Sequence, residues 1–74
     1  MTKKYFVYPE LGWKREVKNA EDLYNMMLEI SKMGIGARLF DWKGSKLVDE
    51  KGKKIGRVSM NGRVWDRKDN EISI

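Results

Sequence analysis

The sequence predicts an α+β fold in which one helix, at about residues 20–33, packs on a mainly antiparallel sheet of four to six strands. Three observations lead to this prediction. One segment has clear helical periodicity, the segments on either side alternate in polarity or are rich in aromatic and β-branched residues, and glycine-containing turn signals separate them. The expected order is strand, strand, helix and then three further strands, with an additional edge strand at the C-terminus.

Two strands are predicted before the helix. Residues 4–8 form a short aromatic and β-branched run, which Pro9 then breaks at a position suited to a turn. A second strand follows from the alternation of apolar with polar or small residues between Leu11 and Val17. Arg15 occupies a position at which this alternation would place an apolar residue, so we expect either a bulge there or the end of the strand. The two strands are expected to form a hairpin.

The helix is the most clearly marked element. Asn19 is a favourable N-cap, and Asp22 three residues later gives something close to a capping box. Gly34 fits the left-handed position that closes a helix. One core-facing stripe is predicted by the helical spacing of Ala20, Leu23, Met26, Met27, Ile30 and Met33.

The rest of the chain is predicted as β-structure. Strands are expected over residues 35–42, 46–48, 54–60 and 71–74. The turn signals between strands are Lys43-Gly44, Asp49 to Gly52, Asn61-Gly62 and Asp69-Asn70. Residues 49–58 resemble the opening hairpin of PRC-barrel domains and of many other β proteins, a resemblance that implies a tight turn between two strands and no particular function.

Asn61-Gly62 predicts the register of one hairpin. A two-residue turn at this pair would place Val58 opposite Trp65 and Arg57 opposite Asp66. Val58 and Trp65 would then lie on the core face, and Arg57 and Asp66 would form a cross-strand ion pair on the other face.

Composition excludes several classes of function. The 74 residues include no cysteine and no histidine, which excludes disulfides, thiol catalysis, zinc fingers and the usual histidine general base. A chain of this length is expected to form one compact domain over residues 1–74, because half of it would be too short to bury a core. The longest apolar run is only the four residues from Tyr5 to Tyr8. We therefore expect no membrane-spanning segment and no signal peptide, which makes a cytoplasmic location the default.

The sequence offers few candidates for catalysis. Asp41, Asp66 and Glu16 are acids within strand-like segments, where burial could raise a pKa. The alternative, which we favour, is that Asp66 forms its cross-strand ion pair and that Asp41 opens a turn. Asp49-Glu50 lacks the alternating ligands of a calcium loop, and no glycine-rich phosphate loop occurs. We therefore expect a protein that is not an enzyme and that binds no metal and no cofactor.

Charge favours a polyanionic partner. The chain has 16 basic and 11 acidic residues, a net charge of +5, and residues 34–59 alone hold seven basic and three acidic groups. A local basic excess is typical of proteins that contact phosphates, and such binding weakens as salt is added. The alternative is that a small domain needs net charge only to remain soluble.

A surplus of aromatic residues among basic ones is the feature most informative about function. The predicted strands carry more large rings than one short helix can cover, so at least one aromatic pair is expected on the open face of the sheet. Rings beside cations on a sheet can stack bases and hold a nucleic-acid backbone. The residues expected to contact nucleic acid or another partner are Arg38, Phe40, Trp42, Lys43, Lys51, Lys53, Lys54 and Arg57.

The expected function is that of a small non-enzymatic binding module. Its leading partner is nucleic acid, either single-stranded or bound without much sequence preference. The alternative is a protein partner, including a second copy of the chain, with the rings as a dry interface core and the charges as its rim. A module of this size would also fit an inhibitor or accessory role of the kind that mobile elements encode. For the lysines around Gly52, the alternative is a solvated hairpin that keeps a sheet edge from pairing.

Overall fold

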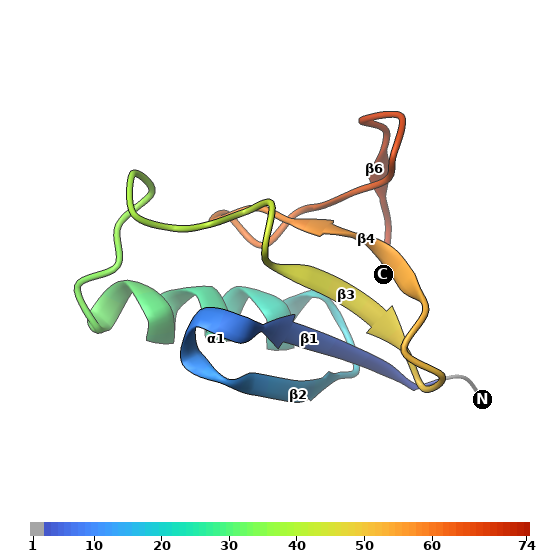
Figure 1. Ribbon diagram of the computed structural model, residues 1–74, viewed down its shortest axis with the longest axis horizontal. Coiled ribbons are helices and arrows are strands. Elements are labelled where there is room, and N and C mark those ends of the chain that lie inside the picture. Colours follow the sequence, from blue (N-terminus) through green and yellow to red (C-terminus); the bar gives the residue numbers. More distant parts are fainter. Residues whose placement is uncertain (1–2) are drawn as a thin grey trace.

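The computed structural model describes residues 3–74, so the first two residues of the predicted domain lie outside the described range. One helix packs on a six-stranded antiparallel sheet, which confirms the predicted α+β class. The elements in chain order are β1 (Lys4–Tyr8), the 3-10 helix η1 (Pro9–Leu11), β2 (Trp13–Val17), α1 (Ala20–Lys32), β3 (Lys46–Asp49), β4 (Lys54–Val58), β5 (Val64–Trp65) and β6 (Glu71–Ile72). The strands lie in the order β2-β1-β3-β4-β5-β6, with α1 behind the sheet in Figure 1.

β1 and β2 form the predicted hairpin. Pro9 begins the connecting 3-10 turn, and Gly12 closes it in the left-handed conformation with a φ of 69°. The pairing runs without interruption from Lys4 opposite Val17 to Tyr8 opposite Trp13. One face of this hairpin therefore meets the helix and the other is left open.

Arg15 lies inside β2, so the expected bulge or strand end is wrong. Its guanidinium carbon lies 3.5 Å from the centroid of the Trp13 ring, and its Nη1 donates to Glu29 Oε2 at 2.7 Å. A long side chain can cover apolar surface while its charged end reaches a partner. Arg15 thus connects the strand to the helix and does not disturb the pairing.

Both helix ends form as predicted, with one change in the cap. Asn19 Oδ1 accepts a hydrogen bond from the Asp22 N–H at 2.9 Å. The Asp22 carboxylate accepts from the Lys18 N–H at 2.9 Å, one residue earlier than a capping box would have it. Beyond the last helical residue, Gly34 has a φ of 87°, as expected for a helix-closing glycine.

Only the centre of the predicted helical stripe is fully buried. Leu23, Met27 and Ile30 form the helix's share of the core. Ala20 is exposed at the first helical position, and Met33 is half exposed just past the last.

Residues 35–42 do not form the predicted strand. The Gly36 carbonyl accepts from the N–H groups of both Leu39 and Phe40, and the Asp41 carbonyl accepts from Gly44 and Ser45. These local turns use the backbone groups that a strand would need for a ladder. With Gly34 and Gly36 at its start, the segment forms a loop of successive turns, and β1 takes the place beside β3.

The β3–β4 hairpin confirms the turn predicted at Asp49 to Gly52. The Gly52 N–H donates to the Asp49 carbonyl at 2.9 Å, and Gly52 has a φ of 84°. A register shift between Leu47 and Val48 places Lys54 opposite Val48. Because of this irregularity, Lys54 and Arg57 lie on the same side of β4.

The β4–β5 hairpin differs by one residue from the predicted register. The Ser59 N–H donates to the Arg63 carbonyl at 2.9 Å, so the loop has three residues and ends on Gly62 with a φ of 82°. Val58 therefore lies opposite Val64, and Arg57 lies opposite Trp65. The predicted Val58–Trp65 and Arg57–Asp66 pairs are both wrong, since a shift of one residue exchanges the faces of a strand.

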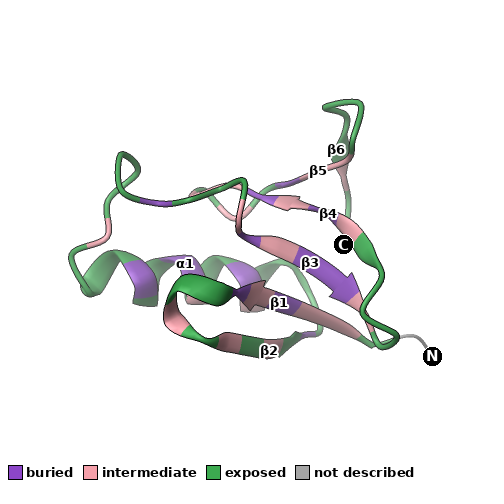
Figure 2. Ribbon diagram, in the orientation of Figure 1, coloured by how far each residue is buried: buried purple, intermediate pink, exposed green. Residues whose placement is uncertain are grey.

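The core lies between α1 and the middle of the sheet. Figure 2 shows buried residues along α1, β1, β3 and β4, while the hairpin turns and the loop before β3 are largely exposed. Its fully buried rings come from β1, with Phe6 and Tyr8 at 0% exposure, and the loop adds Phe40 at 6%. The remaining members of the core cluster are Val17, Leu23, Met27, Ile30, Leu47, Val58 and Val64.

Replacing Gly56 with alanine is expected to destabilise the fold. A Cβ there would lie 2.7 Å from the Trp65 carbonyl oxygen and 2.9 Å from Val64 Cγ1, closer than real Cβ contacts. Relieving such overpacking costs about 1–3 kcal/mol, which urea denaturation would measure. Gly36→Ala is the control, because nothing lies within 4 Å of a Cβ at that position. Equal stability of the two variants would contradict the close approach of β5 to β4.

Phe40→Ala is expected to cost about 3–5 kcal/mol of unfolding free energy, because Phe40 fills the core. Its neighbour Leu39 is 68% exposed, so Leu39→Ala should change stability by less than about 0.5 kcal/mol. Thermal or urea denaturation of the two variants compares them directly. A small loss for Phe40→Ala would show that the loop does not close the core.

Candidate nucleic-acid interface

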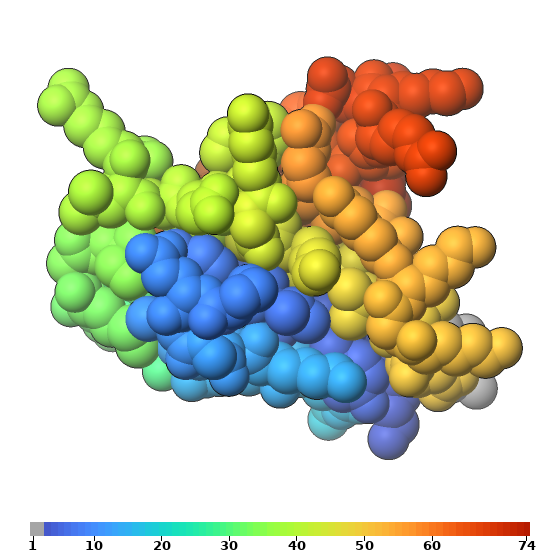
Figure 3. Space-filling model, viewed as in Figure 1, coloured from blue at the N-terminus to red at the C-terminus, as the bar shows by residue number. Residues whose placement is uncertain are grey.

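The face of the sheet opposite α1, here called the open face, is rich in cations and rings. The strand registers place on it Tyr5, Val7, Lys14, Glu16, Lys46, Val48, Lys54, Arg57, Trp65 and Glu71. Figure 3 views this face, with the loop of residues 37–44, the β3–β4 turn and the segment 66–70 projecting around its rim. Val48 is 4% exposed yet lies outside the main core cluster, so this face has a small apolar patch of its own.

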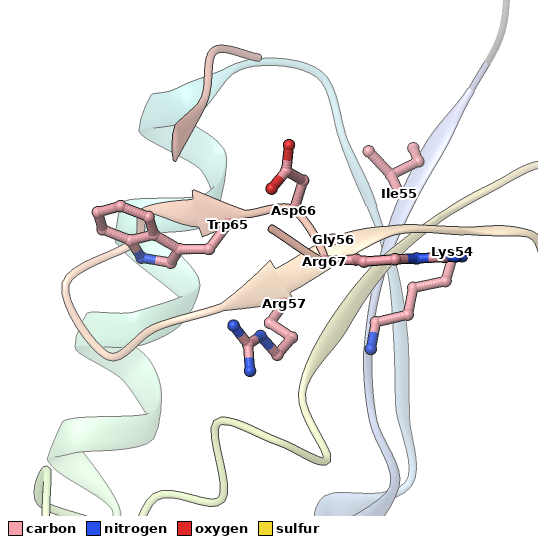
Figure 4. Close-up of a pocket in the computed structure, with 7 residues that line it drawn as sticks. All are labelled: Lys54, Ile55, Gly56, Arg57, Trp65, Asp66 and Arg67. Carbon is pink, nitrogen blue, oxygen red and sulfur yellow. The ribbon is translucent and has the colours of Figure 1, made fainter. Parts of the chain in front are cut away.

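A shallow depression of about 270 Å³ lies at the end of the open face formed by β4 and β5. We call it the cationic depression, and its lining residues are Lys54, Ile55, Gly56, Arg57, Trp65, Asp66 and Arg67. Figure 4 shows the Lys54 ammonium and the Arg57 guanidinium pointing to one side of β4 and the Asp66 carboxylate pointing to the other. The depression thus combines three cationic side chains with the indole of Trp65.

Arg57 is the most constrained of these cations. Its guanidinium carbon lies 4.4 Å from the centroid of the Trp42 ring, and its Nη2 forms an ion pair with Asp69 Oδ1. Lys46 lies opposite it on β3, and Trp65 lies opposite it on β5. The cross-strand ion pair predicted between Arg57 and Asp66 does not form; Arg57 pairs instead with Asp69, which lies in the turn between β5 and β6.

Asp66 instead organises the turn that follows β5. Its Oδ1 accepts from the N–H groups of Lys68 at 2.8 Å and Asn70 at 2.9 Å. The hydrogen bond from Asn70, more than that from Lys68, lowers the pKa of Asp66 below its usual 3.8. The same turn presents Asp69, whose φ of 63° makes it the non-glycine residue with left-handed backbone in the described part of the chain.

The loop before β3 carries four of the expected contact residues, and it separates them. Arg38 and Lys43 are exposed, Trp42 is 40% exposed beside Arg57, and Phe40 is buried. Phe40 is therefore unsuited to direct contact with a partner, because its ring lies 5.2 Å from that of Tyr8 inside the core. Asp41 opens a turn as expected, since its Oδ1 accepts from the Gly44 N–H at 3.0 Å.

Lys51 and Lys53 lie in the exposed turn between β3 and β4. The Asp49 Oδ1 accepts from both of their backbone N–H groups, at 2.9 Å and 2.8 Å, which leaves their ammonium groups in solvent. Lys54 begins β4 next to them and lines the depression. The basic residues expected from the sequence are thus spread between a loop, a turn and one strand.

The sequence did not predict that Trp65 and Arg67 line this depression. The two-residue turn assumed at Asn61-Gly62 assigned Trp65 to the core, whereas the three-residue loop places it on the open face. The available signal was Gly62 itself, because a glycine in the left-handed conformation also ends a three-residue hairpin loop. Arg67 becomes part of the site only through the turn that Asp66 organises.

The rings of the open face and of the loop beside it differ in whether the protein's own cations cover them. The Lys14 ammonium lies 5.2 Å from the centroid of Tyr5, and Arg57 covers Trp42. Within residues 3–74 no lysine or arginine lies over Trp65 in this way. Trp65 is therefore the open-face ring best placed to receive a base or another flat group.

Comparisons with known proteins provide no further assignment. Protein-family models, curated proteins and solved structures give no significant match to this chain. In the part of the chain that the structure describes, no helix is both long and apolar enough to cross a bilayer. No group of three or more acidic side chains there is arranged to hold a metal ion.

Tyr8→Phe is expected to change how stability depends on alkaline pH. Burial, and then the hydrogen bond that the hydroxyl donates to Glu10 at 2.5 Å, raise the pKa of Tyr8 above its usual 10.0. The folded state favours the neutral phenol, so its contribution to stability is full below pH 10.0 and is lost as the pH rises through the raised pKa. The wild type should therefore lose more stability between about pH 9 and 11 than Tyr8→Phe.

Tyr24→Phe is the control for this comparison, because Tyr24 is 53% exposed. Urea midpoints measured across the same pH range should fall in this variant as they do in the wild type. Parallel curves for Tyr8→Phe and the wild type would show that Tyr8 is not held as a buried neutral phenol.

Proposed function

We propose that this protein is a non-enzymatic binding module that contacts nucleic acid, single-stranded or with little sequence preference, through the open face of its sheet. The observation that carries the proposal is the cationic depression, whose lining brings Lys54, Arg57 and Arg67 together with Trp65. Cations of this kind neutralise phosphates, and an adjacent ring can stack on a base whatever its identity.

The local charge supports a phosphate ligand. Asp66 is the carboxylate in the lining, but its Oδ1 accepts two backbone N–H groups of its own turn, and its carboxylate points to the opposite side of β4 from Lys54 and Arg57 (Figure 4). Lys46 lies beside Arg57 on β3 and extends the basic surface toward the middle of the sheet. A backbone of phosphates running from β3 to the turn after β5 would meet cations along its length.

The arrangement of carboxylates supports a binding role over a catalytic one. Asp41 and Asp66, the acids with the best sequence case for catalysis, each accept backbone N–H groups of a local turn. A general acid or base needs a free carboxyl group that can reach a substrate proton. Glu16, the third candidate, is exposed on the edge strand β2.

A protein partner is the second candidate, favoured by large apolar side chains that are exposed. Leu39 is 68% exposed, Met33 50% and Trp42 40%, and a shallow apolar hollow beside them is lined by Ala37, Phe40, Trp42, Ser59 and Met60. Exposed large apolar groups in one region are typical of protein interfaces. This role predicts concentration-dependent mass or a complex that persists in high salt.

Replacing Lys54 and Arg67 together with glutamine is expected to weaken binding of a fluorescein-labelled oligothymidylate. Each lost phosphate contact lowers the slope of log affinity against log salt by about 0.7 for single strands. The double variant should therefore show a slope lower by about 1.4, measured by fluorescence anisotropy over a range of salt concentrations.

Lys18→Gln with Lys32→Gln is the matched control. Both lysines are exposed near the two ends of α1, and the pair removes the same charge from the opposite side of the protein. A comparable loss in the control would show attraction to net charge alone. Absence of oligonucleotide binding by the wild type at low salt would refute the nucleic-acid proposal and leave the protein partner.

A further inference from the structure

The contacts of Arg57 suggest that its site is already occupied by an acid from the same chain. Asp69 Oδ1 accepts from Nη2, and the centroid of the Trp42 ring lies 4.4 Å from the guanidinium carbon. The Nε of Arg57 is buried and has no hydrogen-bond partner within the described residues. A guanidinium recognises an anion best through two parallel N–H groups, so the pairing with Asp69 leaves part of its capacity unused.

Asp69 is held weakly enough to be replaced. Its side chain is 76% exposed, whereas that of Arg57 is 23% exposed, so water competes with the ion pair mainly at the carboxylate. The Asp69 backbone is fixed separately, by the N–H that it donates to the Asp66 carbonyl at 3.0 Å. Rotation of the Asp69 side chain alone would therefore free Arg57 without unfolding the turn.

The surroundings of Arg57 favour a phosphate over this carboxylate. Lys46 lies opposite Arg57, and Lys54 and Arg67 line the same depression. An isolated carboxylate on a turn meets only Arg57, whereas the phosphodiesters of a nucleic-acid strand can meet several of these cations at once. Exchanging one monoanion for another keeps the charge on Arg57 neutralised throughout.

We infer that, in the free protein, Asp69 occupies the place on Arg57 that a phosphodiester oxygen of the bound strand takes, so that Asp69 is an internal competitor of the ligand. This inference rests on the proposed function and adds to it the residue that limits affinity. Trp42 contacts the guanidinium in the free protein, with its ring centroid 4.4 Å from the guanidinium carbon, and this contact does not use the N–H groups that would bind a phosphate.

The test compares Asp69→Asn with Glu29→Gln in binding a fluorescein-labelled oligothymidylate by anisotropy. Both changes remove one negative charge and both release an arginine from an exposed ion pair, since Glu29 pairs with Arg15 at 2.7 Å beside the helix. Asp69→Asn should bind up to about fivefold more tightly than Glu29→Gln, the range that an exposed ion pair is worth. Asp69→Gly repeats the charge change with a residue that adopts the positive φ without strain.

Three outcomes are distinguishable. A gain in affinity in both Asp69 variants, without an equal gain in Glu29→Gln, supports the role of Asp69 as an internal competitor. Equal changes in affinity for Asp69→Asn and Glu29→Gln, with binding retained, would show that Asp69 does not compete with the ligand and would leave the proposed function intact. No binding by any variant at low salt would overturn the proposed function, and the competitor with it. Thermal denaturation of each variant verifies that it is folded.

Discussion

The limited reach of a single helix determines how the rest of the chain is arranged. α1 has 13 residues and lies against a six-stranded sheet, so it covers only part of one face. Its buried side chains pack with Phe6, Tyr8 and Leu47 from the central strands. Elsewhere the same face is closed by Phe40 from the loop before β3. Within residues 3–74 no second layer covers the opposite face.

Because the helix covers only part of the sheet, aromatic side chains occur in two environments. Rings on the helix side are buried together, with centroids 6.2 Å apart for Phe6 and Tyr8 and 5.2 Å for Tyr8 and Phe40. Several less buried rings meet cations instead, as Trp13 meets Arg15 and Trp42 meets Arg57. A cation over a ring shields it from water while keeping a charge at the surface. The basic excess of the chain thus contributes to solubility and to the proposed binding face together.

Caps and turns that depend on neighbouring residues could be predicted from the sequence. Strand pairing and hairpin register, where a shift of one residue changes the result, could not. The cap at Asn19, the glycine after the helix and the turn at Asp49 depend on neighbouring residues and form where expected. The loop over residues 35–42 was mistaken for a strand because its apolar residues suit either structure, and only tertiary competition for β3 decides between them. Of the residues that line the depression, the sequence pointed to Lys54 and Arg57 as possible contacts, whereas the place of Trp65 depends on a hairpin register that two loop lengths could satisfy.

The position of β1 in the sheet has a consequence for how the chain folds. Most neighbouring strands are joined by short turns, but β1 also pairs with β3, which brings Tyr5 beside Val48 across the helix and the long loop. Closing so large a loop has an entropic cost, which is offset only when β1 and β3 are both formed and can pair. The hairpin with its helix and the C-terminal meander are therefore two locally connected halves. We expect the pairing of β1 with β3, which joins these halves, to limit the rate of folding.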